Sequence, residues 1–223
     1  MEKSMVIDLE MCRIGNEYRR KEFPHRHEII QIGAVMLDEE GQLIDEISIF
    51  VHPVYGRVDR FIQDLTGIHE KMLTNAPLIR DALSQLLAWA GDDCKKVYAW
   101  SSSDRAQLMH EIQCKNIDLP GLKEFMDIDH WVDYQRVFST RFQFSWSLNL
   151  QQALDMTDTD TEGHVHNGLD DARNTARLIS KLEMNPDFIL PIHNYTSSED
   201  ESTSSGFSMG ELFSADLLAA LKK

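Results

Sequence analysis

Three segments of this chain carry acidic side chains among apolar neighbours, and the first reads as a strand. Asp8 and Glu10 lie two residues apart within Met5–Met11, which reads M-V-I-D-L-E-M. Because side chains alternate across a strand, both carboxylates fall on the same face. Two adjacent buried carboxylates are costly unless a cation neutralises them, whereas an exposed strand carries acids at little cost. The pair therefore indicates either a metal site or a solvated strand face.

The second acidic segment, H-N-G-L-D-D-A-R-N-T-A-R-L, places a histidine ahead of a predicted helix. Its apolar residues recur at helical spacing, so Asp171 lies near the inward edge of the helix and Asp170 is rotated away. His166 precedes the helix closely enough to lie over the same site, and His164 is a competing histidine. A histidine just before a helix is usually a cap or a surface residue. The hypothesis that His166 is functional therefore depends on its position beside Asp171.

A third acid, Asp104, follows a buried strand that ends at Trp100 in Y-A-W-S-S-S-D. Aspartate is also a common helix N-cap, which is the alternative for Asp104. Trp100 closes the strand, and we expect it to point into the core. The four carboxylates and the histidine together suit two hard divalent cations, because Mg²⁺ and Mn²⁺ prefer carboxylate and water oxygens. Two such ions about 3.5–4 Å apart can hold the attacking and leaving oxygens of a phosphodiester.

The hydrophobic pattern predicts the elements that must position these groups. A strand at Met5–Met11 is followed by a predicted hairpin with strands Glu28–Leu37 and Leu43–Val51 around a turn that ends at Gly41. Another short strand is expected at Val97–Trp100. Apolar residues at helical spacing predict helices over 77–90, 104–114, 147–154 and 169–182. Three leading strands followed by alternating helices and a strand indicate an α/β or α+β layer fold.

The order Asp-x-Glu, then Asp, then His-x4-Asp resembles the motifs of the DEDDh exonucleases, the DnaQ-like group. F-I-Q-D-L-T-G-I at Phe61–Ile68 and N-A-P at Asn75–Pro77 are similar to that family's segment between its first and second motifs. The resemblance covers roughly residues 4–185. Cys12 in D-L-E-M-C and the strand end A-W-S-S-S-D resemble the Eri-type branch, which trims RNA 3′ ends. The resemblance implies an α/β, ribonuclease H-like fold, with a central mixed β-sheet flanked by α-helices.

The resemblance also implies an activity, which is hydrolysis of single-stranded nucleic acid from its 3′ end with release of nucleoside 5′-monophosphates, RNA being favoured. His166 would be the general base and would also contact the substrate, and the family's spacing of five residues selects Asp171 over Asp170. The catalytic carboxylates would hold two Mg²⁺ or Mn²⁺ ions, and they are Asp8, Glu10, Asp104 and Asp171. Two alternatives remain, a DNA-directed trimming or proofreading exonuclease and a catalytically silent nucleic-acid-binding scaffold.

Five apolar or small side chains correspond to the family's contacts with the terminal sugar and base. Leu9, Met11 and Cys12 follow the first motif, and Thr66 and Ile68 belong to the L-T-G-I turn. Ordinary packing is the alternative for each of them. We expect these residues to line the substrate site if the resemblance extends that far.

A net charge of −15 opposes a nucleic-acid partner, because phosphate binding is driven by lysine and arginine. Bound cations would cancel part of that charge. Basic residues are also concentrated in one short stretch, which contains Arg13, Arg19, Arg20, Lys21 and Arg26. We expect this stretch to bind the phosphate backbone of a nucleic acid. The alternative is that it forms a solvated loop without a ligand.

The composition changes sharply after Pro191, which predicts three regions. Residues 1–190 would form the catalytic domain, 191–206 an acidic and serine-rich disordered linker, and 207–223 an amphipathic helix. That helix either docks on the catalytic domain or binds a partner protein, and the length of the linker favours the partner. Three cysteines without disulfide-like spacing predict a cytoplasmic protein. A membrane partner is not expected, since the sequence contains no run of eighteen apolar residues.

Overall fold

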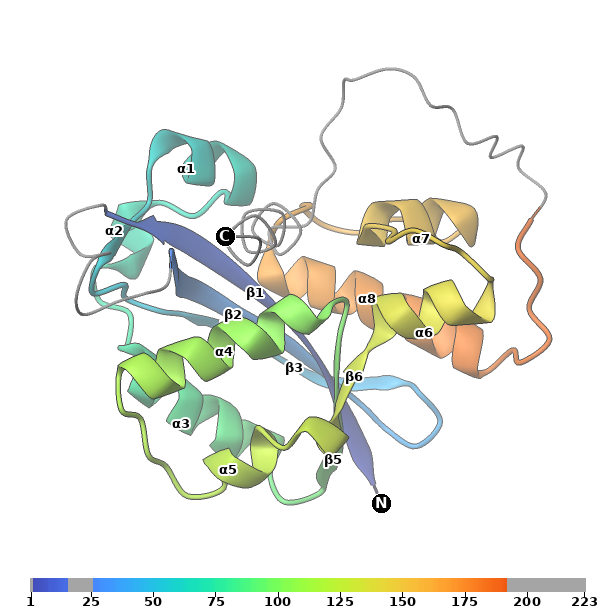
Figure 1. Ribbon diagram of the computed structural model, residues 1–223, viewed down its shortest axis with the longest axis horizontal. Helices are drawn as coiled ribbons and strands as arrows, with labels where there is room; N and C mark the ends of the chain where they lie inside the picture. The colour runs from blue at the N-terminus through green and yellow to red at the C-terminus, as the bar shows by residue number, and fades with distance from the viewer. Residues whose placement is uncertain (1, 16–25, 192–223) are drawn as a thin grey trace, which may run out of the picture.

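The computed structural model describes residues 2–15 and 26–191 (Figure 1). The basic residues Arg19, Arg20 and Lys21 lie outside this range, as do residues 192–206 of the expected linker and the helix expected at 207–223. The predictions about these segments, including a protein partner for the last one, therefore stay predictions. None of the helices in the described residues combines the length and the apolar character needed to cross a membrane.

A mixed sheet forms the centre of the described part of the chain. Its strands run in the order β3–β2–β1–β5–β6, and the short β4 pairs with the end of β1. The strands are β1 (Lys3–Ile14), β2 (His27–Leu37), β3 (Leu43–Phe50), β4 (Gly56–Arg57), β5 (Cys94–Ala99) and β6 (Trp131–Asp133). β1, β2 and β3 are antiparallel neighbours, whereas β5 and β6 run parallel to β1. The predicted strand followed by a hairpin is confirmed, and so is the predicted mixed sheet flanked by helices.

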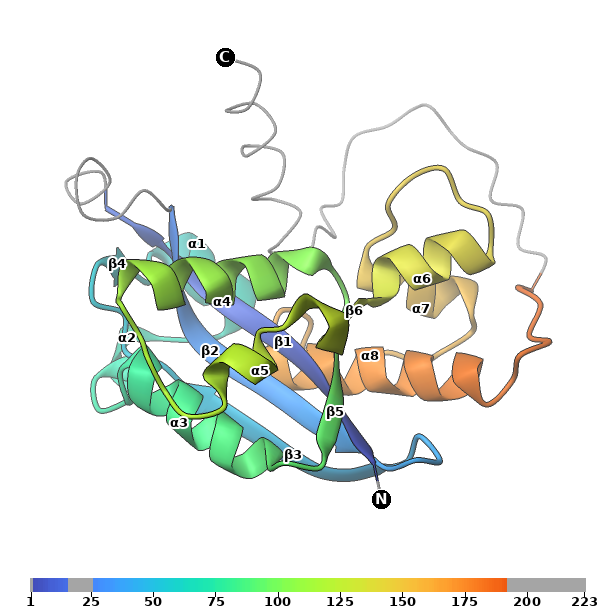
Figure 2. The same ribbon diagram turned by 60° about the horizontal axis from the view of Figure 1, so that its bottom comes forward.

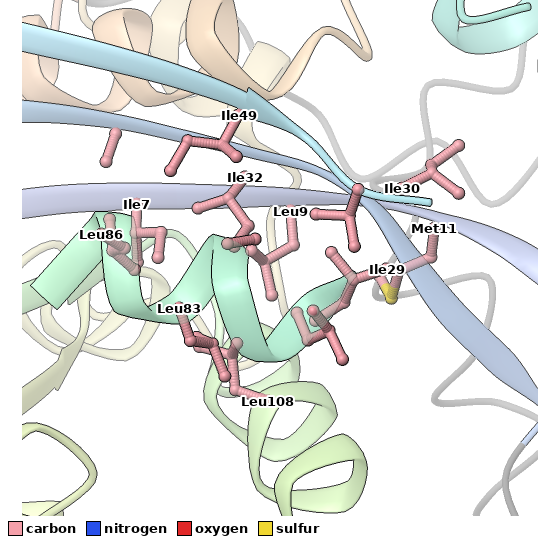
Figure 3. Close-up of a cluster of buried hydrophobic side chains, with 14 of the residues drawn as sticks. Ile7, Leu9, Met11, Ile29, Ile30, Ile32, Ile49, Leu83, Leu86 and Leu108 are labelled. Carbon is pink, nitrogen blue, oxygen red and sulfur yellow. The ribbon is translucent and has the colours of Figure 1, made fainter. Parts of the chain in front are cut away.

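One face of the sheet is covered by α3 (Ile79–Ala90) and α4 (Ser102–Cys114). The apolar side chains of α3 recur at helical spacing, which buries Ile79, Ala82, Leu83 and Leu86 against the sheet. Figure 3 shows Leu83 and Leu86 of α3 beside Ile7, Leu9 and Ile32 of the central strands. The short helices α1 (Arg60–Thr66), α2 (Glu70–Leu73) and α5 (Leu122–Phe125) extend the same apolar cluster.

The opposite face is covered by α8 (Gly168–Glu183), with α6 (Tyr134–Arg141) and α7 (Leu150–Met156) packed beside it (Figures 1 and 2). A single 3₁₀ turn at Ile128–His130 leads into β6. α8 buries Ala172, Ala176 and Ile179, as its spacing predicts, and adds Leu178 and Leu182. Trp100 is buried in this second cluster and its indole donates to the carbonyl of Leu148, which confirms its predicted place in the core.

Three predicted helix starts are wrong by two or three residues, and the first of them is that of α3, which begins at Ile79 and not at Pro77. α7 begins at Leu150, not at Ser147, because Asn149 accepts a hydrogen bond from the amide of Gln152 and caps the helix. α4 begins at Ser102 with Ser101 as its N-cap, so Asp104 lies in the first turn and is not the cap. In α7 and α4 several serines, asparagines or aspartates compete for the cap position, and the sequence pattern alone does not rank them.

Candidate active site

Asp8 and Glu10 lie on β1 just beyond the point where its neighbour β5 ends. The parallel register pairs Ile7 with Ala99, the last residue of β5. On this side of β1 the amide of Leu9 is therefore free of the sheet, and it donates to Oδ1 of Asp104 over 3.2 Å. In open α/β sheets ligands bind beyond the carboxyl ends of parallel strands, and these carboxylates occupy that position.

Asp104 reaches β1 because α4 starts immediately after β5. Ser101 accepts a hydrogen bond from the amide of Ser103 and starts the helix, so its first turn stands over the strand ends. Asp104 is buried there beside Leu9. The short connection between β5 and α4 thus brings the third predicted acid to the first two.

The amino end of α8 reaches the site through close backbone packing on β2. A Cβ atom on Gly33 would lie 2.1 Å from the carbonyl carbon of Gly168, so only glycine permits this approach. The amide of Gly168 donates to Oε1 of Gln31 over 3.0 Å, and a Cβ on Gly168 would lie 3.1 Å from the carbonyl oxygen of Asp8. These contacts hold the start of α8 directly above β1.

This packing distinguishes between the competing acids and histidines. Asp171 and His166 line the same pocket as Asp8 and Glu10, and the amide of His166 donates to Oδ2 of Asp171 over 2.9 Å. Asp170 instead accepts from the amide of His164 and from the guanidinium of Arg173. The predicted pair therefore reaches the pocket, while Asp170 and His164 are bound to each other at the surface.

The five predicted catalytic residues line one pocket between β1, α4, α7 and α8. Its wall also contains polar and apolar side chains that the sequence had not assigned to it, among them Ser101, Ser103, Asn149, Gln151, Thr161 and Val165. The capping pattern N-x-x-Q placed Asn149 at a helix start, but no sequence signal placed that helix beside β1. Sequence reasoning missed Gln31 and Gly33 as well, because their roles depend on contacts between distant segments.

The electrostatics of the pocket are dominated by buried acids that lie close together. Burial, and then the neighbouring carboxylates, raise the pKa of Asp8 and of Glu10 well above the ordinary range. Burial likewise raises the pKa of Asp104 and of Asp171 to about 7. Burial, followed by the nearby His164, lowers the pKa of His166. The site would therefore bind protons tightly unless a cation replaced them.

The donor set fits a divalent cation. Glu10, His166 and Asp171 each present one ligand atom, and these three atoms lie within 4.8 Å of one another. Glu10 is 1% exposed, and its Oε2 has no hydrogen-bond partner among the described residues. A buried carboxylate oxygen without a partner is rare in folded proteins and is satisfied by an ion or an ordered water. Carboxylate oxygens are the ligands that Mg²⁺ and Mn²⁺ prefer.

The predicted substrate contacts divide into two groups. Leu9 lines the pocket, although it also packs in the core. Met11, Cys12, Thr66 and Ile68 are buried, and they do not line this pocket. The hydroxyl of Thr66 donates to the carbonyl of Ile62 in its own helix and accepts from the amide of Ile68, which follows the helix. Packing thus accounts for these four in the structure, and the substrate role is best supported for Leu9.

Comparison with known proteins places this geometry in context. The sequence profile of the RNase_T family, described as an exonuclease family, matches residues 5–179. The 3′-5′ exoribonuclease 1 of Mus musculus is 26% identical over 186 residues, which cover 79% of this chain and 52% of that protein. The DNA polymerase III PolC-type of Staphylococcus saprophyticus is 32% identical over 88 residues, covering 40% of this chain and 5% of that protein. The chain thus spans about half or less of the length of these relatives.

A solved structure with the same arrangement supports the fold assignment. It concerns 3′-end-specific recognition of a histone mRNA stem-loop by a 3′-exonuclease. It superimposes with a TM-score of 0.69 at 20% identity and covers 82% of both chains. The predicted ribonuclease H-like fold and the resemblance to exonucleases are confirmed by these comparisons. The resemblance to the Eri-type branch is confirmed by the ERI1 exoribonuclease 2 of Xenopus laevis, which is 25% identical over 179 residues, covering 70% of this chain and 25% of that protein.

Proposed function

Because the chain belongs to the RNase_T exonuclease family, we propose that it removes nucleotides from the 3′ end of single-stranded nucleic acid, preferably RNA. The products would be nucleoside 5′-monophosphates. The observation that carries this proposal is the gathering of four carboxylates and His166 in one pocket, from β1, α4 and the start of α8. A scaffold without activity would have no need to keep these acids together at such electrostatic cost.

Asp8, Glu10, Asp104 and Asp171 are the residues that would hold two Mg²⁺ or Mn²⁺ ions. When bound, such ions stabilise the charge that develops on a phosphodiester as its bond to the 3′ oxygen breaks. The chain's own contribution is to fix four carboxylates at the ends of rigid elements. The backbone bonds from Leu9 to Asp104 and from His166 to Asp171 restrict two of these side chains before any ligand arrives.

His166 would act as the general base. Its lowered pKa keeps the imidazole neutral at pH 7, so a ring nitrogen can accept a proton from the attacking water. The residue adopts a positive φ of 64°, which is uncommon outside glycine and directs its side chain from a tight turn into the pocket. A ring nitrogen of His166 also lies within 4.8 Å of carboxylate oxygens of Glu10 and Asp171, close enough for the three groups to share one ion, so its role as a metal ligand is tested separately.

The preference for RNA rests on the relatives. The Mus musculus relative is named an exoribonuclease, and its match extends over most of this chain. A second candidate is a DNA-directed exonuclease, which is favoured by the match to the bacterial DNA polymerase over 88 residues. The two substrates differ at the 2′ position, because only RNA carries a 2′-hydroxyl that can donate and accept hydrogen bonds.

The test is a degradation assay on matched single-stranded RNA and DNA oligonucleotides labelled at the 5′ end. With Mg²⁺ or Mn²⁺ we expect the RNA to shorten stepwise from its 3′ end, and EDTA should stop the reaction. A protected 3′ end should also prevent it. Faster loss of the DNA would establish the second candidate, and no shortening of either substrate would overturn the exonuclease assignment.

The role of His166 is tested by His166→Ala, with His164→Ala as the matched control. We expect the first variant to lose roughly 10²–10⁴-fold in rate, the usual contribution of a general base. Its affinity for Mg²⁺, measured by calorimetry, should change little, whereas a large loss would make His166 a metal ligand. The control should retain nearly full activity because His164 lies outside the pocket.

A further inference from the structure

Three arginines and an exposed phenylalanine gather at the far end of β1. β4 pairs with this end, so that Arg57 lies directly opposite Arg13, and α1 begins at Arg60. The guanidinium of Arg13 lies 5.5 Å from the ring centroid of Phe61. All four side chains are exposed, and Phe61 retains 47% of its accessible surface. We call Arg13, Arg57, Arg60 and Phe61 the basic ridge.

The basic ridge is held by buried interactions beneath it. The carboxylate of Glu28 is fully buried and accepts hydrogen bonds of 2.7–2.8 Å from the amides of Val54, Tyr55 and Gly56. These residues lead directly into Arg57. Asp59 caps α1 by accepting from the amide of Ile62, which fixes the first turn that carries Phe61. The ridge is therefore preorganised, unlike a charged loop whose side chains must be ordered on binding.

Its chemistry fits single-stranded nucleic acid. Proteins that bind such strands without sequence preference combine cations that follow the phosphates with exposed aromatic rings on which bases stack. Phe61 offers such a ring on its free face, while Arg13 occupies a position over it. Arg60 also forms an exposed ion pair with Asp64 at 3.6 Å, which contributes little in water and can exchange for a phosphate. In a chain of net charge −15, such a local concentration of arginines attracts a polyanion to this part of the surface.

Arg13 of the basic ridge lies on β1, the strand that also carries Asp8 and Glu10. Five residues separate Asp8 from Arg13, which corresponds to about 16 Å along an extended strand. A stacked nucleic-acid strand advances about 3.4 Å per nucleotide, so the ridge would meet a nucleotide roughly five positions upstream of the 3′ end. We infer that the basic ridge binds the single-stranded segment upstream of the scissile end and makes the enzyme favour longer substrates. This inference rests on the proposed function.

The test compares short and long substrates with surface variants that leave the pocket intact. Single-stranded oligo(U) and oligo(dT) of 3 and 12 nucleotides are degraded by the wild type, Phe61→Ala, Arg13→Ala and the control Arg136→Ala. Arg136 is an exposed arginine on α6, which both views place at the opposite end of the molecule from α1 (Figures 1 and 2). Fluorescence anisotropy with the same oligonucleotides measures binding independently of cleavage.

For the 12-mer we expect Phe61→Ala to raise the KM and the Kd about 5- to 100-fold, the range of one lost base–aromatic stack, while kcat stays unchanged. Arg13→Ala should reduce the slope of log Kd against log salt by about one. Neither variant should alter kcat/KM on the 3-mer, and Arg136→Ala should behave as the wild type. Equal behaviour of all four proteins on the 12-mer, or equal losses on both lengths, would overturn the inference. If the wild type degraded neither substrate, the proposed function would fail, and anisotropy would still decide whether the ridge binds the strand.

Discussion

Glu28 and Glu111 are buried as deeply as Glu10, yet the two groups of carboxylates are neutralised in different ways. The ammonium of Lys115 lies between Glu28 and Glu111 and forms an ion pair with each of them. Backbone amides complete the set, three donating to Glu28 and that of Ile29 to Glu111. In the pocket, by contrast, Oε2 of Glu10 has no partner among the described residues, and burial, followed by the neighbouring acids, raises the pKa of Asp8 and of Glu10.

The difference separates an acid that stabilises the fold from one that is kept for a ligand. A buried charge that is paired and hydrogen-bonded can be tolerated within the core, whereas an unpaired one destabilises the folded state. Glu28 and Glu111 use their charge to hold the strand end and the segment that carries β4. Among the described residues Oε2 of Glu10 has no such partner, so its charge is available for cations from solution.

The largest effect is expected when one unpaired acid is made neutral. Asp8→Asn should reduce nuclease activity roughly 10³-fold or more, because ion binding contributes several kcal/mol to transition-state stabilisation. The melting temperature in EDTA should stay the same or rise, since the substitution removes repulsion between like charges. Calorimetry and a degradation assay measure both. An inactive protein that also melts far below the wild type would show that Asp8 stabilises the fold. It would contradict the distinction between the pocket acids and the paired glutamates.

A loss of stability is expected, in contrast, when the ion pairs of Lys115 with Glu28 and Glu111 are removed. Lys115→Met keeps the apolar stem but removes the cation from two buried carboxylates, which should lower the free energy of unfolding by about 3–5 kcal/mol. Urea denaturation gives this value, and Lys123→Met, at an exposed position of α5, is the matched control. A loss no greater than that of the control would mean that Lys115 does not balance the two glutamates.

A smaller effect on stability should accompany disruption of the contact that completes the pocket. Gly33→Ala forces the backbone of Gly168 away from β2 and should cost about 1–3 kcal/mol through overpacking. Activity should fall as well, because Asp171 and His166 move with the start of α8. Gly168→Ala should be milder, since its nearest neighbours would lie at 3.1–3.4 Å. Full activity in Gly33→Ala would show that α8 can shift without moving the catalytic groups.

The smallest effect concerns an acid that is paired at the surface. Glu46 on β3 accepts from Nε of Arg173 on α8 over 2.8 Å, and this bond lowers the pKa of Glu46 below its ordinary value of 4.5. Stability from this pair is present above about pH 4.5 and is lost as the pH falls through the lowered pKa. Glu46→Gln should therefore cost about 0.2–1 kcal/mol at pH 7 and less at acidic pH, as measured by urea denaturation. A cost that grows on acidification would assign the stability to another group.

The sequence by itself determined the longer strands and helices and the identity of the reactive groups. Strand alternation put Asp8 and Glu10 on one face, and helical spacing placed Asp171 at the inward edge of α8, because these patterns depend only on neighbours a few residues away. The resemblance then selected His166 and Asp171, and the structure brings this pair to the pocket. The short segments β6 and α6 escaped prediction, as did α1, because short elements carry too few apolar residues to show a period.

Only the tertiary structure decided how the acids meet and how their charges are balanced. The end of β5 beside Ile7 exposes the amide that binds Asp104, and the contact of Gly33 with Gly168 places α8 over β1. Lys115 reaches Glu28 across 87 residues of sequence, and β4 brings Arg57 to Arg13 across the sheet edge. Which carboxylate is paired and which is left for a ligand therefore depends on long-range contacts. A local pattern reports which face a side chain takes, but the partner on that face comes from a distant part of the chain.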